Sequence, residues 1–494
     1  MNKNRLLLLV FLLFISFEIF SQSTEKQRVI ISEGKFFYKK ELYFPMIMNY
    51  QLDIYTDNEM DYWAGPHHGY SSDNKRCCNN QTDALMSIFS DFAQIKEMGF
   101  NCIRLCGVEM EAENLTASQN MFYLTKKGKD LQIIKKAYTT QHGKALASII
   151  NSILNEAQEL DLKVIVLTGK KNIHRPKISN IYGDWLSLLA DTLKNNPALF
   201  AYDLYNEPIH SSSAGLTKNN IEEITEDWQK KIIKRDKNAL ITYGIMGHAD
   251  VMMWDPSILK CDFLSFHLYP EPNNFRYVEA SINWIQQNID KVWIIGETGY
   301  SSNDTAKTYP AWGNLEMQKK YAEFVLVKSY CCGAIGFSWW VYKDVFWGSV
   351  QNWFGLIDHQ GNTKPANAVL KKGISKIACN DCIQADDLHY FRLENCTYTV
   401  TGSVEDEFGK PLANAVIYGW NKKWEQHVYT FSDHWGKFKL CSANEITYIK
   451  ASALGKTTIH KIVSLDQEKT KNIGRLELKP YNEKRHRKKT KRFR

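Results

Sequence analysis

The sequence predicts an α/β protein: a (β/α)8 TIM barrel followed by a small all-β sandwich domain. Eight β-rich runs alternate with helical stretches between about residues 44 and 345. An apolar fraction of 44% is enough to build a substantial core. After about residue 397 the helical patterns stop, and short alternating stretches between Gly, Asp and Pro turns replace them.

The eight β-rich runs are the expected barrel strands. Several are almost continuously apolar, as parallel strands covered on both faces should be. Apolar residues at three- and four-residue spacing, as in 149–160 and 185–193, predict amphipathic helices between the runs. A doubly wound open sheet competes with the barrel, but no glycine-rich phosphate loop follows the first run. The runs are residues 44–49, 100–105, 163–167, 199–205, 240–245, 263–268, 292–295 and 334–340.

The amino-terminal segment has the features of a secretory signal peptide, which we expect to span residues 1–22. Two basic residues precede an apolar run from residue 6 to residue 17, which is too short to cross a bilayer, and a polar stretch follows. The first cysteine is Cys77, so no cysteine is available for lipid attachment at the expected cleavage site. We therefore expect a secreted or periplasmic protein, with an uncleaved signal anchor as the alternative.

The positive charge of the chain is concentrated at its carboxyl end. The formal net charge is +8, and residues 484–494 alone carry eight basic residues and no acid, so the rest of the chain is neutral. A neutral body and export both disfavour a nucleic-acid partner. The tail, residues 480–494, is expected to be disordered; it either contacts an anionic cell surface or acidic glycan or is simply solvated.

The cysteines favour disulfides or free thiols over a metal centre. Eleven is an odd number, so at least one cysteine is unpaired if the others form disulfides. Cys379 and Cys382 have CxxC spacing, but no second CxxC or histidine pair accompanies them. We expect a local disulfide or free thiols there, and no zinc or iron–sulfur site.

Two glutamates occupy matching positions at the ends of predicted strands. Glu207 follows the fourth run and Glu297 follows the seventh, where barrel enzymes carry their catalytic groups. They are 297 − 207 = 90 residues apart, or about three βα units, so they should face each other across the barrel mouth. Two carboxylates across a cleft suit glycoside hydrolysis, in which one donates a proton and the other attacks the anomeric carbon.

The motifs around these glutamates resemble those of the retaining glycoside hydrolases of clan A, most closely family 5. The motifs are Tyr-Asn-Glu-Pro at the fourth run, Phe-His-Leu-Tyr at the sixth and Gly-Glu at the seventh, and the resemblance covers about residues 40–370. It implies that Glu207 is the general acid/base and Glu297 the nucleophile, with no metal or cofactor. The carboxyl groups should be about 5–5.5 Å apart, and the pKa of Glu207 should be raised.

The same resemblance assigns the other site residues. Asn206 would bind the sugar 2-hydroxyl, Tyr269 would orient the nucleophile, and His267 would face the substrate. Arg104, at the end of the second run, would keep the nucleophile ionised. Trp340 would form the floor of the sugar subsite. Trp339 and Trp340 are neighbours on a strand, so only one of them can face inward, and we expect it to be Trp340. Each residue also has an alternative without a role in catalysis. Asn206 would be a turn or helix-cap residue, His267 and Tyr269 would be ordinary core aromatic residues, and Arg104 would form a surface salt bridge.

The sequence departs from the family pattern at the end of the third run. Many family members carry a histidine at its end, whereas this chain continues with Thr-Gly-Lys, and His174 lies further along. The sugar preference therefore stays open between β-mannan and β-glucan. Whether the insertion at residues 53–83 makes the action exo or endo also stays open. A non-catalytic glycan-binding protein and a transglycosylase are the alternative functions, and we expect a monomer.

The carboxyl-terminal segment resembles the carboxypeptidase regulatory-like domain over about residues 397–479. The matching stretches are 401–406, 409–412 and 432–438, with hairpin turns at 407–409 and 433–436. We expect an antiparallel sandwich, joined by a linker at 376–396 to a barrel at 30–375. A spacer or stability module is the favoured role, with glycan or surface attachment next.

Overall fold

The computed structural model describes most of the chain, and the predicted signal peptide lies outside the described residues. Most of the linker and nearly all of the basic tail also lie outside them. None of the described helices has the length and apolar character needed to span a membrane. The described residues are 28–56, 62–71, 77–111, 121–126, 133–137, 140–210, 215–270, 275–303, 313–347, 350–379, 382, 396–423, 427–463 and 469–481.

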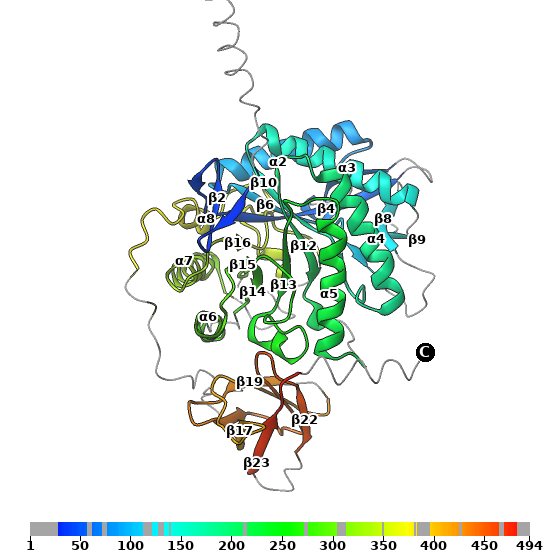
Figure 1. Ribbon diagram of the computed structural model, residues 1–494. Helices are drawn as coiled ribbons and strands as arrows, with labels where there is room; N and C mark the ends of the chain where they lie inside the picture. Colours follow the sequence, from blue (N-terminus) through cyan, green and yellow to red (C-terminus); the bar gives the residue numbers. More distant parts are fainter. Residues whose placement is uncertain are drawn as a thin grey trace, which may run out of the picture.

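The central feature is a closed barrel of eight parallel strands, which confirms the predicted fold class (Figure 1). Each predicted run contributes one strand. Closure comes from pairing of the last strand with the first, with Phe337 opposite Met46 and Trp339 opposite Met48. The strands are β4 (Met46–Thr56), β6 (Cys102–Cys106), β10 (Lys163–Leu167), β12 (Leu199–Asn206), β13 (Leu240–Ile245), β14 (Leu264–His267), β15 (Trp293–Glu297) and β16 (Phe337–Trp339).

Helices cover the outside of the barrel and bury their apolar faces against it. Side-chain caps set the starts of some of them, as at α5, where Thr217 and Asn220 form a reciprocal capping box. A three-stranded sheet of β1 (Ile30–Ser32), β2 (Lys35–Tyr38) and β3 (Glu41–Leu42) places Phe36 in a second apolar cluster. The helices are α2 (Gln81–Glu97), α3 (Thr140–Glu159), α4 (Pro176–Leu193), α5 (Lys218–Ile233), α6 (Arg276–Asn288), α7 (Leu315–Cys331) and α8 (Pro365–Leu370).

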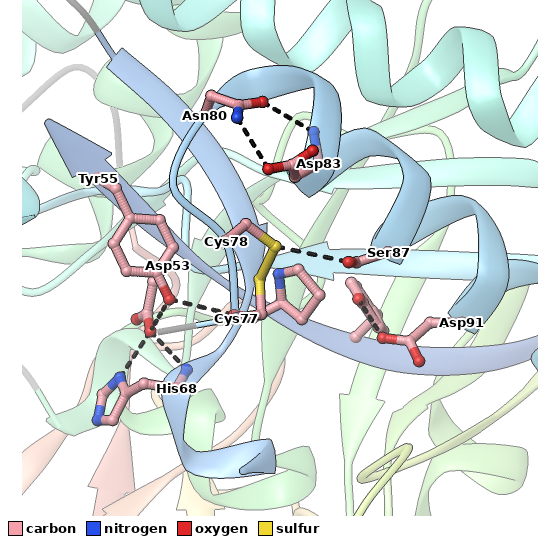
Figure 2. Close-up of a disulfide and its surroundings, with 11 residues drawn as sticks. Asp53, Tyr55, His68, Cys77, Cys78, Asn80, Asp83, Ser87 and Asp91 are labelled. Carbon is pink, nitrogen blue, oxygen red and sulfur yellow. Dashed lines mark hydrogen bonds and ion pairs between the residues drawn. A yellow bond between two sulfur atoms is a disulfide. The ribbon is translucent and has the colours of Figure 1, made fainter. Parts of the chain in front are cut away.

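Short strands that follow the first three barrel strands build an accessory sheet at the barrel mouth. β4 continues beyond the barrel and pairs with β5 (Tyr62–Pro66), which leads into the 3-10 turn η1 (His68–Tyr70). This hairpin belongs to the predicted insertion, whose Asp53, Tyr55 and His68 are labelled in Figure 2. The remaining strands of the sheet are β7 (Met110–Glu111), β8 (Met121–Lys126), β9 (Ile133–Ala137) and β11 (Gly169–Lys170).

Four disulfides form among the described cysteines, and one expectation about them is wrong. Cys379 and Cys382 do not bond to each other: Cys379 pairs with Cys331 and Cys382 with Cys332, so both bridges connect the end of α7 to the segment after α8. The helix presents two adjacent thiols to that segment, which a single sequence cannot reveal. The other bridges are Cys77–Cys78 (Figure 2) and Cys396–Cys441, and the free thiols are Cys102, Cys106 and Cys261.

The carboxyl-terminal domain is a two-sheet sandwich, but it is not purely antiparallel. One sheet has the order β20-β17-β23 and the other β19-β18-β21-β22. The last strand, β23, does not pair with β22, which precedes it in the sequence. It pairs instead with the first strand of the domain, β17, and runs parallel to it. Gly409 and Gly436 have positive φ. The turn at 433–436 joins β19 to β20, which lie in different sheets, so it is not the hairpin turn that was predicted. The strands are β17 (Tyr398–Asp406), β18 (Val416–Trp420), β19 (His427–Phe431), β20 (Lys437–Ser442), β21 (Tyr448–Ser452), β22 (Ile459–Ile462) and β23 (Thr470–Leu478).

The sandwich packs tightly against the barrel (Figure 1). Val416 and Phe431 belong to the main apolar core of the barrel, and Phe431 stacks on Trp284 of α6. At the start of α5 the buried ammonium of Lys218 donates to Asp255 at 2.8 Å and to Ser452 of the sandwich at 3.0 Å. A shared apolar core and buried polar contacts fit a stability module better than a spacer.

We expect Phe431→Ala to destabilise the whole protein rather than the sandwich alone. Phe431 is 2% exposed, and removal of a buried phenyl ring costs about 3–5 kcal/mol. Phe408→Ala is the matched control, because Phe408 is 86% exposed on the same domain. Thermal unfolding followed by circular dichroism checks this. A barrel transition whose midpoint is unchanged in Phe431→Ala would contradict the shared core.

Candidate active site

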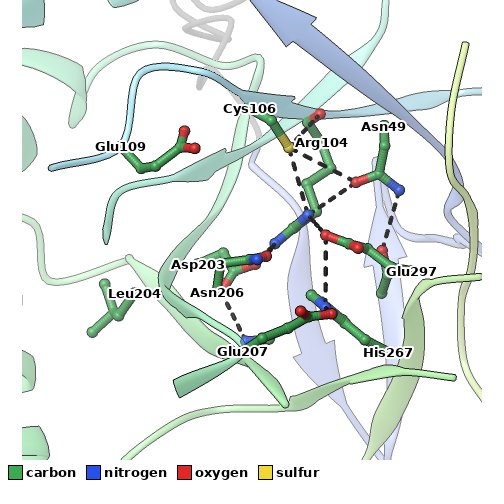
Figure 3. Close-up of polar contacts among 12 residues, drawn as sticks. Asn49, Arg104, Cys106, Glu109, Asp203, Leu204, Asn206, Glu207, His267 and Glu297 are labelled. Atoms are coloured by element: carbon green, nitrogen blue, oxygen red, sulfur yellow. Dashed lines mark hydrogen bonds and ion pairs between the residues drawn. The ribbon is translucent and has the colours of Figure 1, made fainter. Parts of the chain in front are cut away.

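The site is organised around the buried guanidinium of Arg104, which ends up between three barrel strands (Figure 3). Nε and Nη2 both lie 2.8 Å from Oδ2 of Asp203, and Nη2 also donates to Asn206 at 2.8 Å. Nη1 donates to Asn49 at 3.0 Å and pairs with Oε1 of Glu297. All five N–H groups are thereby used, as a buried guanidinium requires.

Glu297 is the last residue of β15, and two groups hold its carboxylate. Arg104 binds one oxygen, while the hydroxyl of Tyr269 donates to the other at 2.8 Å. The residue is 5% exposed. Burial, together with the neighbouring Glu297 charge, raises the pKa of Tyr269 well above its usual value, so this hydroxyl keeps its proton and remains a donor.

Glu207 lies directly after β12 in a strained backbone conformation that turns its side chain into the site. Its φ is +47°, in the left-handed region that non-glycine residues rarely adopt. The conformation is held by the backbone N–H of Glu207, which donates to Gly244 of β13 at 2.8 Å. Gly244 also has to be a glycine, because a Cβ there would lie 2.6 Å from Nε2 of His267.

His267 lies between the two carboxylates. Its Nδ1 is 3.0 Å from Oε1 of Glu207 and 3.6 Å from Oε1 of Glu297. One oxygen of each carboxylate and one nitrogen of the ring all lie within 4.8 Å of one another. The two acids, predicted from distant parts of the chain, therefore meet at one point (Figure 3).

The predicted direction of the Glu207 pKa is wrong for the free protein. Burial is the largest influence and raises the pKa of Glu207, as expected. The hydrogen bond and charge of His267, helped by His210 and Arg104, outweigh burial and lower the pKa below its usual value. The prediction missed this because the positions of the positive groups around an acid depend on the fold.

The neighbours Trp339 and Trp340, at the end of β16, point in opposite directions, as strand alternation predicts. Trp339 is fully buried, faces Tyr321 of α7 and donates its Nε1–H to Phe354. Trp340 is only partly buried, and its ring lies 6.0 Å from that of Trp347. The two rings together form an aromatic pair after β16.

No histidine stands at the end of the third barrel strand, and His174 does not replace it. His174 is fully buried, with its Nδ1 2.8 Å from the hydroxyl of Tyr205 and its ring stacked on that side chain. At Gly169 a Cβ would lie 2.3 Å from Ile173, so a side chain does not fit there. The absence of a histidine at the end of the third strand is therefore consistent with the packing around Gly169 and His174.

Two residues of the site were not predicted: Asn49 and Asp203. Asn49 accepts from Arg104 and donates to Ser338 at 2.7 Å, and Asp203 accepts from the backbone of Gly244 at 3.0 Å. Each is a polar residue inside an otherwise apolar run, and each is fully buried. A polar residue in a buried strand needs a partner, and that signal was present in the sequence.

A second group of metal-type ligands lies on the insertion. Donor atoms of Asp53, His67 and His68 lie within 4.8 Å of one another (Figure 2 shows Asp53 and His68). However, Nδ1 of His67 accepts the N–H of Gly69, and burial lowers the pKa of His67 to about 4. Its one proton is then on Nε2, which faces Asp53 at 3.6 Å and offers no lone pair to a metal.

Comparison with solved structures finds matches at low identity. They include an exo-β-1,4-mannosidase from Opitutaceae bacterium strain TAV5, at 16% identity and a TM-score of 0.48, over 69% of this chain and 61% of that one. A β-D-glucuronidase of Dictyoglomus thermophilum matches at 14% and 0.46, over 71% and 54%. A GH5_18 protein of Streptomyces cattleya, in complex with GlcNAc, matches at 12% and 0.47, over 74% and 84%.

The chain thus spans little more than half the length of the first two of these three proteins. No curated protein matches it. The family model described as "Cellulase (glycosyl hydrolase family 5)" matches residues 71–343, which is more than half of the 494 residues. The chain belongs to glycosyl hydrolase family 5.

Proposed function

We propose that the protein is a retaining glycoside hydrolase that cleaves β-linked polysaccharides or oligosaccharides of the β-mannan or β-glucan type. The observation that carries this proposal is the approach of Glu207 and Glu297, with oxygens within 4.8 Å on either side of His267. Retaining enzymes hold their carboxyl groups about 5–5.5 Å apart, whereas inverting enzymes need about 6.5–9.5 Å to admit a water. The short separation supports a covalent intermediate.

In the first step Glu297 attacks the anomeric carbon while Glu207 protonates the departing glycosidic oxygen. Arg104 and Tyr269 fix both oxygens of Glu297, which keeps the carboxylate ionised and aimed. The anomeric C–O bond to the aglycone breaks as the bond to Glu297 forms. A glycosyl–enzyme ester and a free alcohol result.

In the second step Glu207, now ionised, takes a proton from water, and the water oxygen displaces Glu297 from the anomeric carbon. His267 suits this step, because its hydrogen bond favours the charged form of Glu207. Asn206 has its carbonyl oxygen occupied by Arg104, so its NH2 group is what it offers to the sugar 2-hydroxyl. The sugar leaves with its original configuration.

The proton for the first step has to be gained when substrate binds. The pKa of Glu207 is lowered in the free protein, yet burial already pushes it upward more than any other single influence. A sugar over Trp340 would displace water from the carboxyl group and strengthen that push. We infer that Glu207 takes up its proton as the substrate enters.

We expect Glu297→Gln to lose hydrolysis of an aryl β-glycoside by about 10⁴-fold or more, because no other carboxylate of the site can form the ester. Glu226→Gln, at an exposed position on α5, serves as the control and should keep full turnover. Initial rates of chromophore release give the measurement. Full turnover by Glu297→Gln would end the assignment.

Product stereochemistry tests the mechanism separately from the activity. A retaining enzyme should release the β-anomer first, because the sugar is inverted twice. Proton NMR during the first minutes of a digest distinguishes this from the α-anomer. Initial appearance of the α-anomer would contradict the nucleophile role of Glu297 while leaving hydrolysis itself in place.

A buried acid close to Glu207 should make stability depend on pH. Asp250, in the 3-10 turn η3 (Gly247–Met252) after β13, accepts the N–H of Met246 at 2.5 Å. Burial raises the pKa of Asp250 to about 8, so the folded protein keeps this proton when the unfolded chain has lost it. Stability from Asp250 is therefore present below the ordinary aspartate pKa and falls as pH rises toward about 8.

We expect Asp250→Asn to raise the unfolding midpoint relative to wild type, with a gain that grows between pH 4 and pH 8. Asparagine keeps the acceptor for Met246 but has no proton to lose. Thermal unfolding over this pH range measures the gain. The exposed Asp184→Asn is the control, and an equal gain at every pH would contradict the assignment.

We also propose that the protein acts outside the cytoplasm. The support is the basic start, short apolar run and polar end of the first 22 residues, together with the four disulfides among the described cysteines. The basic tail would then meet an anionic surface or acidic glycan.

A further inference from the structure

Four charged residues form a cluster at the barrel mouth that the mechanism does not use. Glu109 and Glu111 follow the second barrel strand, while Lys170 and Lys171 follow the third. The short strands β7 and β11 bring them together, with Lys170 opposite Glu111 in a parallel pair. We call these four residues the mouth cluster.

Ion pairs hold the mouth cluster in a defined arrangement. Lys170 binds Glu109 at 2.8 Å and lies 3.6 Å from Glu111, which in turn binds Lys171 at 2.7 Å. The second oxygen of Glu109 accepts the N–H of Gly107. Two lysines and two glutamates leave the cluster with no net charge.

The Glu109–Lys170 pair combines burial with access to solvent. The Glu109 side chain is 4% exposed, whereas the Lys170 side chain is 29% exposed. The nearby lysine charge outweighs burial and lowers the pKa of Glu109, so this carboxylate is ionised at neutral pH. A fixed anion and cation side by side can accept from one hydroxyl and donate to the next.

The pair lies close to the Arg104 network, through Cys106. Glu109 is three residues beyond Cys106, whose Sγ is 3.5 Å from Nη1 of Arg104. Burial raises the pKa of the Cys106 thiol, and the charges of Glu109 and Glu297 both add to the rise. The end of the third strand is paired with the fourth, Leu167 opposite Asp203. Lys170 therefore emerges next to the strand that carries the catalytic motif.

The local packing makes Lys170 the polar residue that this part of the site offers. Gly169 has no room for a side chain, and His174 is buried against Tyr205. Lys170 is the first charged side chain after the third strand. A Cβ at the preceding Gly169 would lie 2.9 Å from the carbonyl oxygen of Leu204. Leu204 is two residues before Asn206, which we assign to the sugar 2-hydroxyl, so Lys170 would face hydroxyls that follow on the same ring.

We propose that Glu109 and Lys170 bind neighbouring hydroxyls of the sugar that Glu297 attacks, and that they select neutral sugars over uronic acids. The proposal rests on the proposed glycosidase function. A neutral sugar can donate a hydroxyl to Glu109 and accept from Lys170. A uronate would approach Glu109 with like charge, and every lysine of the mouth cluster is already matched by a carboxylate.

The first test is Lys170→Met, assayed on 4-nitrophenyl β-D-glucoside, β-D-mannoside and β-D-glucuronide. Loss of a charge-assisted hydrogen bond should lower kcat/KM on the neutral glycosides by about tenfold to a hundredfold. Lys231→Met is the matched control, because Lys231 has the same 29% side-chain exposure and binds Asp184 at 2.7 Å on the outer helix α5. The control should match wild type.

The second test is Glu109→Gln, which leaves a positive charge at Lys170 that its nearest carboxylate no longer balances. The ratio of kcat/KM on the glucuronide to kcat/KM on the neutral glycosides should rise. Circular dichroism confirms folding of both variants, and each variant tests the proposal if the other fails to fold. Wild-type preference for the glucuronide, or variants with unchanged ratios and rates, would overturn the inference while leaving the hydrolase function intact.

Binding separates this inference from the function on which it rests. If wild type cleaves none of the glycosides, the proposed function fails, and titration calorimetry of Glu297→Gln with the same neutral glycosides becomes the test. Binding that weakens about tenfold or more when Lys170→Met is added supports the pair as a sugar site. Equal binding with and without Lys170→Met, or absence of binding, overturns it.

Discussion

The buried guanidinium of Arg104 is the interaction on which the site depends. It satisfies five donors with groups from three other barrel strands and holds Asn49, Asn206, Asp203 and Glu297 around one guanidinium. A charge removed from water is tolerable only when such partners surround it. The positions of Glu297 and Asn206 are therefore consequences of one cation held inside the barrel.

The barrel and the two acids could be predicted because they depend on local patterns. Continuous apolar runs identify buried parallel strands, and residues at the ends of such strands share one face of a barrel. Glu207 and Glu297 follow from that rule alone. Strand alternation likewise predicts that only one of Trp339 and Trp340 faces inward, and Trp339 packs outward against Tyr321 of α7.

The rest depends on contacts between distant parts of the chain. The pairing of Cys331 with Cys379, the parallel return of β23 and the mouth cluster each need a fold before they can be seen. The pKa of Glu207 is the clearest case. Burial could be anticipated for an acid in a cleft, but the nearby position of His267 reverses the net direction.

The docking of the sandwich on the barrel bears on how such a chain can change over generations. Val416 and Phe431 complete an apolar core that otherwise belongs to the barrel, and Ser452 shares the buried Lys218 with Asp255. An appended domain on a loose tether can be lost or exchanged without harm to its neighbour. Here a truncated gene would encode a barrel with an exposed apolar surface where the sandwich had packed, so the two domains are constrained to be inherited together.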